Sequence, residues 1–196
     1  MSVYDPITVS RLEAMSSPDP AVRPAVLPIR LYGIIRESIV DGPGLRFVVF
    51  VQDCPHRCPG CHNPESHDPK GGFATTTERI WETLVKNPML RGVTFSGGEP
   101  FLWAKELAEV GRCAVKRGLD VMTYSGWTID QLRKKAETDG AVRELLSVTR
   151  YLVDGRFEED KRDLSIRFRG SRNQHIWDLS AGYAENEAVL LDDIWK

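Results

Sequence analysis

The stretch Arg46–Asn63 reads RFVVFVQDCPHRCPGCHN and joins two very different kinds of sequence. Its first part, Arg46–Gln52, is a β-branched and aromatic run of the kind that forms a buried strand. Its second part holds Cys54, Cys58 and Cys61 in the spacing C-x3-C-x2-C. Three cysteines so close together indicate a chemical site on a loop that directly follows a strand.

The chain has four cysteines, and the fourth, Cys113, lies far from this cluster. Three neighbouring thiols leave one unpaired, so the pattern does not indicate a disulfide framework. Zinc would need a fourth protein ligand, which His56, His62 or Cys113 would have to supply. An iron–sulfur cluster normally takes four cysteines, so three would leave one iron open. Spacing alone leaves both metals open, although we expect Cys113 to pack in the core as a small hydrophobe.

Composition excludes several classes of protein. The chain has 196 residues, and its 26 Lys and Arg against 28 Asp and Glu give a net charge of −2. This balance argues against a dedicated nucleic-acid binder, which normally carries a basic face. No apolar run approaches the roughly 20 residues that a membrane span needs. The first residues lack the basic and apolar regions of a secretory signal, so we expect a cytoplasmic protein.

The chain divides into two regions. Residues 1–28 hold five of the twelve prolines, which predicts an extended or disordered arm. Residues 29–196 alternate between short apolar strands and amphipathic helices, which predicts one α/β domain with a mostly parallel sheet covered by helices. Too few strands fit for a complete eight-fold barrel. The predicted strands are Ile29–Ile35, Arg46–Gln52, Gly92–Ser96, Leu119–Tyr124, Arg150–Asp154 and His175–Leu179. The predicted helices are Thr77–Asn87, Trp103–Arg117, Thr128–Lys135 and Ala141–Leu146.

Several polar residues follow the predicted strands. Two glycines, Gly97 and Gly98, would let a ligand approach the backbone closely, and Glu99 would place an anion beside it. The same motif could also form a simple turn into the next helix. Ser125 and Asp154 stand at strand ends, where ligand-contacting groups of α/β sheets gather, although both also suit ordinary turns.

The cysteine spacing resembles the cluster-binding signature of the radical S-adenosylmethionine superfamily. The following His62-Asn63 resembles the glycyl-radical-enzyme activases within it, and Ser96–Pro100 resembles the superfamily's methionine-binding motif. The resemblance implies a 4Fe–4S cluster on Cys54, Cys58 and Cys61, with an open iron that binds S-adenosylmethionine and yields a 5′-deoxyadenosyl radical. It also implies contacts to S-adenosylmethionine from Gly60, Cys61, His62, Gly97, Gly98, Glu99, Ser125 and Asp154, with Glu99 receiving the ammonium group.

Two further segments narrow the resemblance. Leu152–Phe157 (LVDGRF) and Phe168–His175 (FRGSRNQH) resemble the C-terminal region of anaerobic ribonucleoside-triphosphate reductase activating proteins. The similarity runs from about Ile29 to Leu179. It implies a partial (β/α) barrel, a large glycyl radical enzyme as the protein substrate, and reduced flavodoxin or ferredoxin as the electron donor. Asp53 is a departure, because the family more often has glycine there.

Three other interpretations stay open at this point. The chain resembles activases of other glycyl radical enzymes, such as the formate-lyase type, through the same cysteine motif. A zinc-stabilised binding module without catalysis would need a histidine as its fourth ligand. A simple electron-transfer protein would leave Gly97–Pro100 without a role. The turn Asp41-Gly42-Pro43-Gly44 resembles a segment near the active site of activases, and it also suits a plain chain reversal.

Overall fold

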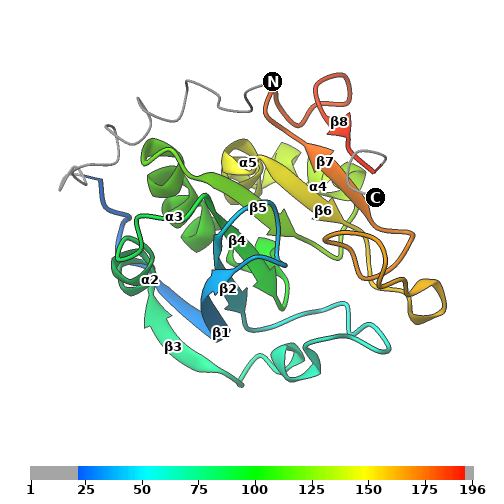
Figure 1. Cartoon of the computed structure of the whole chain (residues 1–196), viewed down its shortest axis with the longest axis horizontal. Helices are drawn as coiled ribbons and strands as arrows, with labels where there is room; N and C mark the ends of the chain where they lie inside the picture. The colour runs from blue at the N-terminus through cyan, green and yellow to red at the C-terminus, as the bar shows by residue number, and fades with distance from the viewer. Residues whose placement is uncertain (1–21, 193–196) are drawn as a thin grey trace, which may run out of the picture.

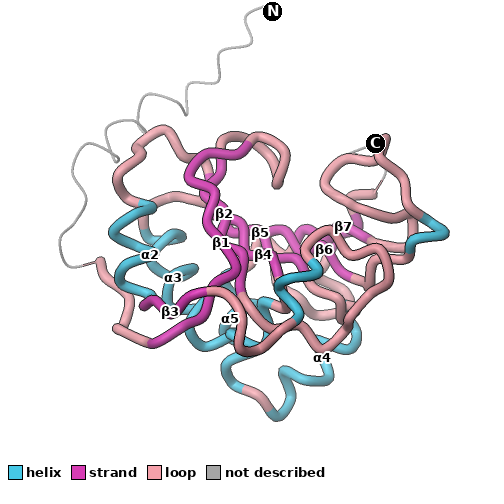
Figure 2. The backbone as a smooth tube through the Cα atoms, turned by 90° about the horizontal axis from the view of Figure 1, so that it is seen from below, coloured by secondary structure: helices cyan, strands magenta, loops and turns pink. Residues whose placement is uncertain are grey.

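The computed structural model describes residues 22–192, which form one eight-stranded sheet with helices packed on it (Figure 1). Figure 2 shows the helices gathered on one side of the strands. The strands are β1 (Pro28–Ser38), β2 (Arg46–Val51), β3 (Phe73–Thr76), β4 (Gly92–Gly97), β5 (Asp120–Tyr124), β6 (Tyr151–Asp154), β7 (His175–Asp178) and β8 (Val189–Leu190). The helices are α2 (Thr77–Leu84), α3 (Ala104–Lys116), α4 (Ile129–Thr138) and α5 (Gly140–Val148), with short 3-10 turns η1 (Pro64–His67), η2 (Pro100–Trp103) and η3 (Glu159–Lys161).

The sheet is parallel in its centre and antiparallel at both sides. Its order is β3-β1-β2-β4-β5-β6-β7-β8, and the pairs β2–β4, β4–β5 and β5–β6 are parallel. The other four pairs, β1–β2, β1–β3, β6–β7 and β7–β8, are antiparallel. Antiparallel pairs therefore outnumber parallel pairs by four to three, and the prediction of a mostly parallel sheet is wrong. The connection 39–45 between β1 and β2 is too short for the crossover that parallel pairing requires, so the chain reverses there.

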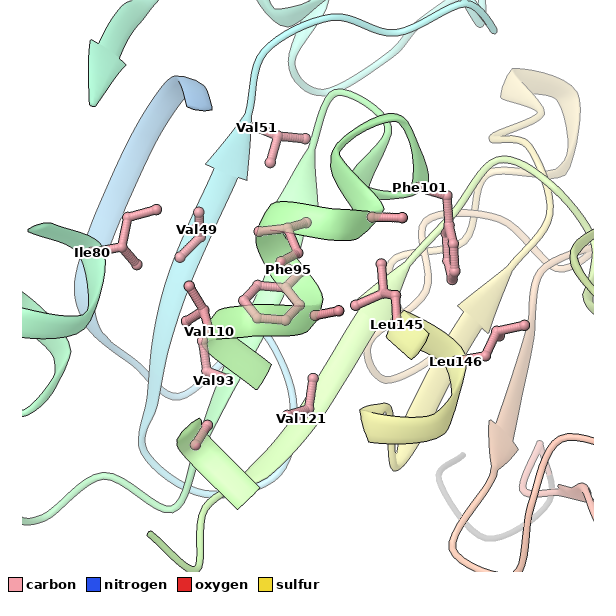
Figure 3. Close-up of a cluster of buried hydrophobic side chains, with 14 of the residues drawn as sticks. Val49, Val51, Ile80, Val93, Phe95, Phe101, Val110, Val121, Leu145 and Leu146 are labelled. Carbon is pink, nitrogen blue, oxygen red and sulfur yellow. The ribbon is translucent and has the colours of Figure 1, made fainter. Parts of the chain in front are cut away.

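The core lies between the central strands and the helices. Strand β2 is buried on both faces, as its sequence RFVVFV predicts for a central parallel strand. Val49, Phe95 and Val121 on three neighbouring strands meet Val110 of α3 and Leu145 of α5 (Figure 3). This packing holds the carboxyl ends of β2, β4 and β5 at one edge of the sheet.

All ten predicted helices and strands are present, with ends that differ by a few residues. Prediction missed β3 and β8, which are only four and two residues long. Both are mostly exposed, so they carry no buried alternating pattern by which a strand is recognised. Strand β3 exists because it pairs with β1 through long-range backbone hydrogen bonds.

The expected arm at residues 1–28 lies mostly outside the described residues, which begin at 22. Residues 22–27 form no helix or strand and are hydrogen-bonded to α2 and α3. The N–H of Thr77 donates to the carbonyl of Leu27, and the N–H of Leu27 donates to the Thr77 hydroxyl oxygen, both at 3.0 Å. The N–H of Ala25 donates to Glu109 at 3.1 Å. Within residues 22–192, no helix is long and apolar enough to cross a membrane.

Candidate functional site

A cavity of about 720 Å³ opens where the parallel strands end. Its wall contains residues from the segments that follow β2, β4, β5 and β6, and from the long segment before β7. Parallel strands bring their carboxyl ends to the same edge of a sheet, and loops that leave that edge form ligand sites. The topology therefore gathers segments far apart in the sequence into a single site.

The three clustered cysteines all line this cavity. Cys54 is buried, Cys58 and Cys61 are half-buried, and all three are free thiols. The loop that carries them winds tightly, since Asp53, Arg57 and Gly60 have φ of 79°, 47° and 69°. Its turn is closed by the Cys61 N–H, which donates to the carbonyl of Cys58 at 3.2 Å.

Burial favours the protonated form of two of these thiols, Cys54 and Cys58. It raises the pKa of Cys54 to about 11, although the backbone N–H groups of His56 and Arg57 partly oppose the rise. Burial also raises the pKa of Cys58. A thiolate is the form that binds metal, so a metal centre would have to displace these protons.

The three thiols lie on one cavity wall, where a metal centre could take them as ligands. Within residues 22–192, no three His, Cys, Asp or Glu side chains are grouped so that they could hold one metal ion. The irons of a 4Fe–4S cluster each take their own thiolate, so three thiols spread along a cavity wall fit such a cluster. Cys113 packs in the core on α3 and is 5% exposed, as predicted.

Gly97 and Gly98 line the cavity at the end of β4, where Gly97 packs against β2 and Gly98 packs against Asp53, directly before Cys54. The N–H of Gly98 donates to the carbonyl of Val51 at 2.8 Å. A Cβ atom on Gly98 would lie 2.2 Å from the carbonyl oxygen of Asp53, and one on Gly97 would lie 2.7 Å from the backbone of Phe50. The glycines therefore permit a close approach of two chain segments, in addition to leaving the cavity wall bare.

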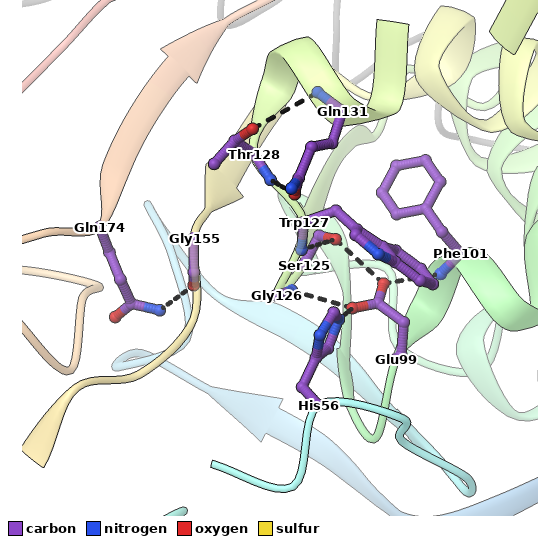
Figure 4. Close-up of polar contacts among 10 residues, drawn as sticks. All are labelled: His56, Glu99, Phe101, Ser125, Gly126, Trp127, Thr128, Gln131, Gly155 and Gln174. Carbon is purple, nitrogen blue, oxygen red and sulfur yellow. Dashed lines mark hydrogen bonds and ion pairs between the residues drawn. The ribbon is translucent and has the colours of Figure 1, made fainter. Parts of the chain in front are cut away.

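Glu99 lies behind the cavity wall rather than on it. Its side chain is fully buried, and its two oxygens accept four hydrogen bonds (Figure 4). Oε1 accepts from the N–H of Phe101 at 3.1 Å and from the Ser125 hydroxyl at 3.0 Å. Oε2 accepts from the N–H of Gly126 and from Nε2 of His56, both at 2.8 Å. A carboxylate has about four acceptor sites, so the protein itself fills those of Glu99.

Ser125 and Asp154 both lie at strand ends, but only Ser125 is on the cavity wall. Ser125 lines the cavity, and its hydroxyl oxygen also accepts the N–H of Trp127 at 3.0 Å. Asp154 is 2% exposed and lies off the cavity wall, where its Oδ2 accepts the N–H of Ile129 at 2.6 Å. Burial raises the pKa of Asp154. It caps the start of α4 in this position.

The remaining predicted residues lie on the cysteine loop and on the turn before β2. His62 is exposed, lines the cavity and packs its ring 5.2 Å from that of Phe157. Gly60 lies off the wall, where the side chain of Glu159 fills the space that a Cβ atom would occupy. Asp41 lines the cavity, and its Oδ2 accepts the hydroxyl of Ser38 at 2.5 Å.

Some cavity residues were not predicted. Tyr124, Gly126, Gly155 and Phe157 line the wall, as does His56, which sequence analysis considered only as a possible zinc ligand. The sequence did carry a signal for His56, because it lies between two cysteines of the motif. The others follow strands whose ends meet the cysteine loop only after the sheet has formed.

Comparison with known proteins agrees with this site. Residues 40–177 match the family model described as a 4Fe-4S single cluster domain. The chain is 31% identical over 151 residues to the anaerobic ribonucleoside-triphosphate reductase-activating protein of Escherichia coli K12, covering 72% of this chain and 94% of the relative. The corresponding protein of Pasteurella multocida is 34% identical over 153 residues, covering 71% of this chain and 91% of the relative.

A more distant relative shares a shorter segment. The pyruvate formate-lyase-activating enzyme of Clostridium pasteurianum is 38% identical over 95 residues, covering 46% of this chain and 40% of that enzyme. The reductase-activating proteins are instead matched over nearly their whole length. The chain therefore belongs to the family of anaerobic ribonucleoside-triphosphate reductase-activating proteins, within the 4Fe-4S single cluster domains.

Proposed function

We propose that this protein is a radical S-adenosylmethionine activase that installs a glycyl radical on anaerobic ribonucleoside-triphosphate reductase. Its membership of the activating-protein family supports the reaction. The observation that carries the proposal is the shared cavity: Cys54, Cys58 and Cys61 line it together with Gly97 and Gly98. A cluster ligand set and a bare glycine wall thus face the same space.

The cofactors supply the radical chemistry. With S-adenosylmethionine bound and an electron delivered, a 4Fe–4S cluster supplies a 5′-deoxyadenosyl radical that abstracts hydrogen from a glycine of the partner. The protein binds, orients and shields these groups. Cys54, Cys58 and Cys61 would hold three irons through thiolates, and the absence of a fourth cysteine from the cavity wall leaves one iron for S-adenosylmethionine.

The cavity wall suggests how S-adenosylmethionine would be oriented. The segment Gly60–His62 would contact S-adenosylmethionine through Cys61 and His62, which line the cavity, and Gly97 and Gly98 would form the wall for the methionine end, with Glu99 behind them. Ser125 lines the cavity at the end of β5, which would place it near the ribose. Asp154 would contribute from the next strand by fixing the start of α4 through Ile129.

The fold would leave the site accessible to a protein substrate. Strands β2, β4, β5 and β6 form a parallel series with antiparallel strands on both sides, which we interpret as a partial (β/α) barrel. A partial barrel has an open side, and a loop of a large glycyl radical enzyme would enter there. We place the protein in the cytoplasm, with reduced flavodoxin or ferredoxin as its electron donor.

The proposed chemistry is tested on the protein purified without oxygen. Its iron and sulfide content is measured, the cluster is reduced, S-adenosylmethionine is added, and 5′-deoxyadenosine is assayed. The proposal requires about four irons and four sulfides per chain and formation of the nucleoside. Zinc in place of iron, or a fully loaded cluster that forms no 5′-deoxyadenosine, would contradict it and support a non-catalytic module.

A second candidate is an activase for an enzyme of the formate-lyase type. The similarity to the Clostridium pasteurianum enzyme favours it, because that segment is 38% identical. Both candidates form 5′-deoxyadenosine, so that assay does not separate them. They differ in which purified glycyl radical enzyme gains a radical.

A further inference from the structure

His56 lies inside the cysteine loop but turns away from it. It sits between Cys54 and Cys58, and its side chain is only 3% exposed. Its Nε2 lies 2.8 Å from Oε2 of Glu99, at the end of β4 (Figure 4). Because an ionised carboxylate only accepts hydrogen bonds, this contact uses the imidazole with its proton on Nε2. The cysteine loop is thereby joined to another strand by a side-chain contact within the core of the site.

The imidazole ring is also fixed by packing. Trp127 meets it edge to face, with ring centroids 4.8 Å apart. Gly126 leaves room for it, because a Cβ atom there would lie 2.3 Å from Cδ2 of His56. The N–H of Gly126 donates to the same Glu99 oxygen as His56, at 2.8 Å. The ring therefore occupies a closely fitted place between the ends of β4 and β5.

Glu99 depends on these donors. The Glu99 side chain is fully buried, so water cannot replace a donor that is lost. The carboxylate oxygen concerned would then lack a hydrogen bond from either water or protein. Such an unsatisfied buried group costs more than the net gain from an ordinary hydrogen bond. Glu99 also holds the Ser125 hydroxyl and the Gly126 N–H, which belong to the opposite wall. His56 and Glu99 thus connect the cysteine loop to the wall that would face S-adenosylmethionine.

We infer that His56 is a positioning residue: its hydrogen bond to Glu99 holds the cysteine loop against the ends of β4 and β5, in place for the cluster before any cluster is bound. The inference deepens the proposed function and rests on it, since it assigns His56 a role at the same site. It also assigns Glu99 the task of ordering His56, Ser125 and Gly126. Three of its four hydrogen bonds serve that task, and the fourth is accepted from the N–H of Phe101.

Two substitutions separate the hydrogen bond from the bulk of the ring. In His56→Gln, the side-chain amide places an N–H near the position of Nε2 and can still donate to Glu99. In His56→Leu, the volume remains and the donor is lost. His175→Leu is the matched control, because it removes a histidine–carboxylate pair of 2.5 Å with Asp192 on the exposed side, off the cavity wall.

The first readout needs no cluster. Amide hydrogen exchange of the apoprotein is followed in the peptide that spans residues 54–61. We expect exchange to be about tenfold faster in His56→Leu, because a hydrogen bond to a charged group contributes at least the 1.4 kcal/mol that corresponds to that factor. His56→Gln and the control should stay close to wild type.

The second readout is the rate at which an iron chelator bleaches the reconstituted cluster. We expect the cluster to bleach much faster in His56→Leu than in His56→Gln. The bleaching rate of His56→Gln should be close to that of the wild type. Gly126→Ala provides an independent variant, since it displaces the ring without altering His56 and should resemble His56→Leu in both measurements. Thermal melts verify that each variant is folded.

The outcomes distinguish this inference from the proposed function. Wild-type exchange in His56→Leu would overturn the role of His56, whatever the cluster does. Equal losses in His56→Leu and His56→Gln would also overturn it, because the hydrogen bond would then not be the connection. A wild-type protein that binds no cluster would contradict the proposed function, while the exchange measurement would still test the position of the loop.

Discussion

The backbone N–H of Glu99 donates to the carbonyl of Asp53 across a distance of 2.8 Å. This hydrogen bond joins the end of β4 to the residue directly before Cys54. The strand that carries the two glycines and the loop that carries the three cysteines are thus fixed at their nearest point. The site is built as a contact between two motifs, each of which is incomplete alone.

Gly98→Ala is expected to disrupt that contact. The new Cβ atom would lie 2.2 Å from the Asp53 carbonyl oxygen, which belongs to the backbone and cannot rotate away. We expect a loss of about 2 kcal/mol or more in the free energy of unfolding and poor retention of iron. Urea denaturation and iron analysis measure both effects.

Gly33→Ala is the control for Gly98→Ala, because a Cβ atom at Gly33 meets nothing within 4 Å. It should change the unfolding free energy by less than about 1 kcal/mol. If both variants retained wild-type stability and iron content, the close approach of β4 to the cysteine loop would be wrong.

Asp53→Gly is expected to stabilise the protein. Asp53 has φ of 79°, a left-handed conformation that glycine adopts freely and other residues adopt at a cost. We expect the unfolding free energy to rise by up to about 1 kcal/mol, and Asp53→Val to lower it by a similar amount or more. Thermal melts of the two variants give the comparison. A destabilised Asp53→Gly would mean that the aspartate side chain stabilises the loop.

We expect three of the four cysteines to be needed for the cluster, and Cys113 to be needed only for packing. Cys58→Ala removes a thiol from the cavity wall, so we expect loss of the cluster and of 5′-deoxyadenosine formation. Cys113→Ala removes a thiol that packs in the core, so iron content should stay at the wild-type level while stability falls by about 1 kcal/mol. Iron loss in Cys113→Ala with an intact fold would contradict the assignment of the ligands.

Asp154→Asn should change how stability depends on pH. Burial raises the pKa of Asp154, so the native state binds this proton more tightly than the unfolded chain does. The unfolding free energy of the wild type therefore falls as the pH rises from about 3.9 through the raised native pKa. Asparagine does not titrate, so the melting temperature of Asp154→Asn relative to wild type should rise over this interval and then level off.

The measurement for Asp154 is a series of thermal melts from pH 4 to pH 8 for both proteins. A constant difference in melting temperature across the whole range would contradict a raised pKa.

The centre of the fold was predictable because its strands are buried on both sides. The sequence of β2 shows this as the apolar run FVVFV after Arg46, and β4 is buried over its first four residues, GVTF. The cavity follows from where such strands end. The sheet's edges were not predictable in the same way. Pairing of β1 with both β2 and β3 depends on where the chain reverses, which local patterns do not specify.

The candidate site was predictable as far as spacing determines it. The cysteine motif identified the loop, and the glycine motif identified the facing strand. The direction of individual side chains was not predictable. Glu99 and His56 meet only because β4 and β5 place Gly126 beside them, a relationship that spans residues far apart in the sequence.

The most direct test of the proposed function uses electron paramagnetic resonance on the partner. Purified anaerobic ribonucleoside-triphosphate reductase is incubated without oxygen with the reconstituted protein, S-adenosylmethionine and a reductant, and a formate-lyase-type enzyme is treated in parallel. The proposed function predicts a glycyl radical signal on the reductase, and its loss when Cys58→Ala replaces the wild type. A loaded wild-type protein that gives no signal on the reductase, or a signal on the formate-lyase-type enzyme alone, would contradict it.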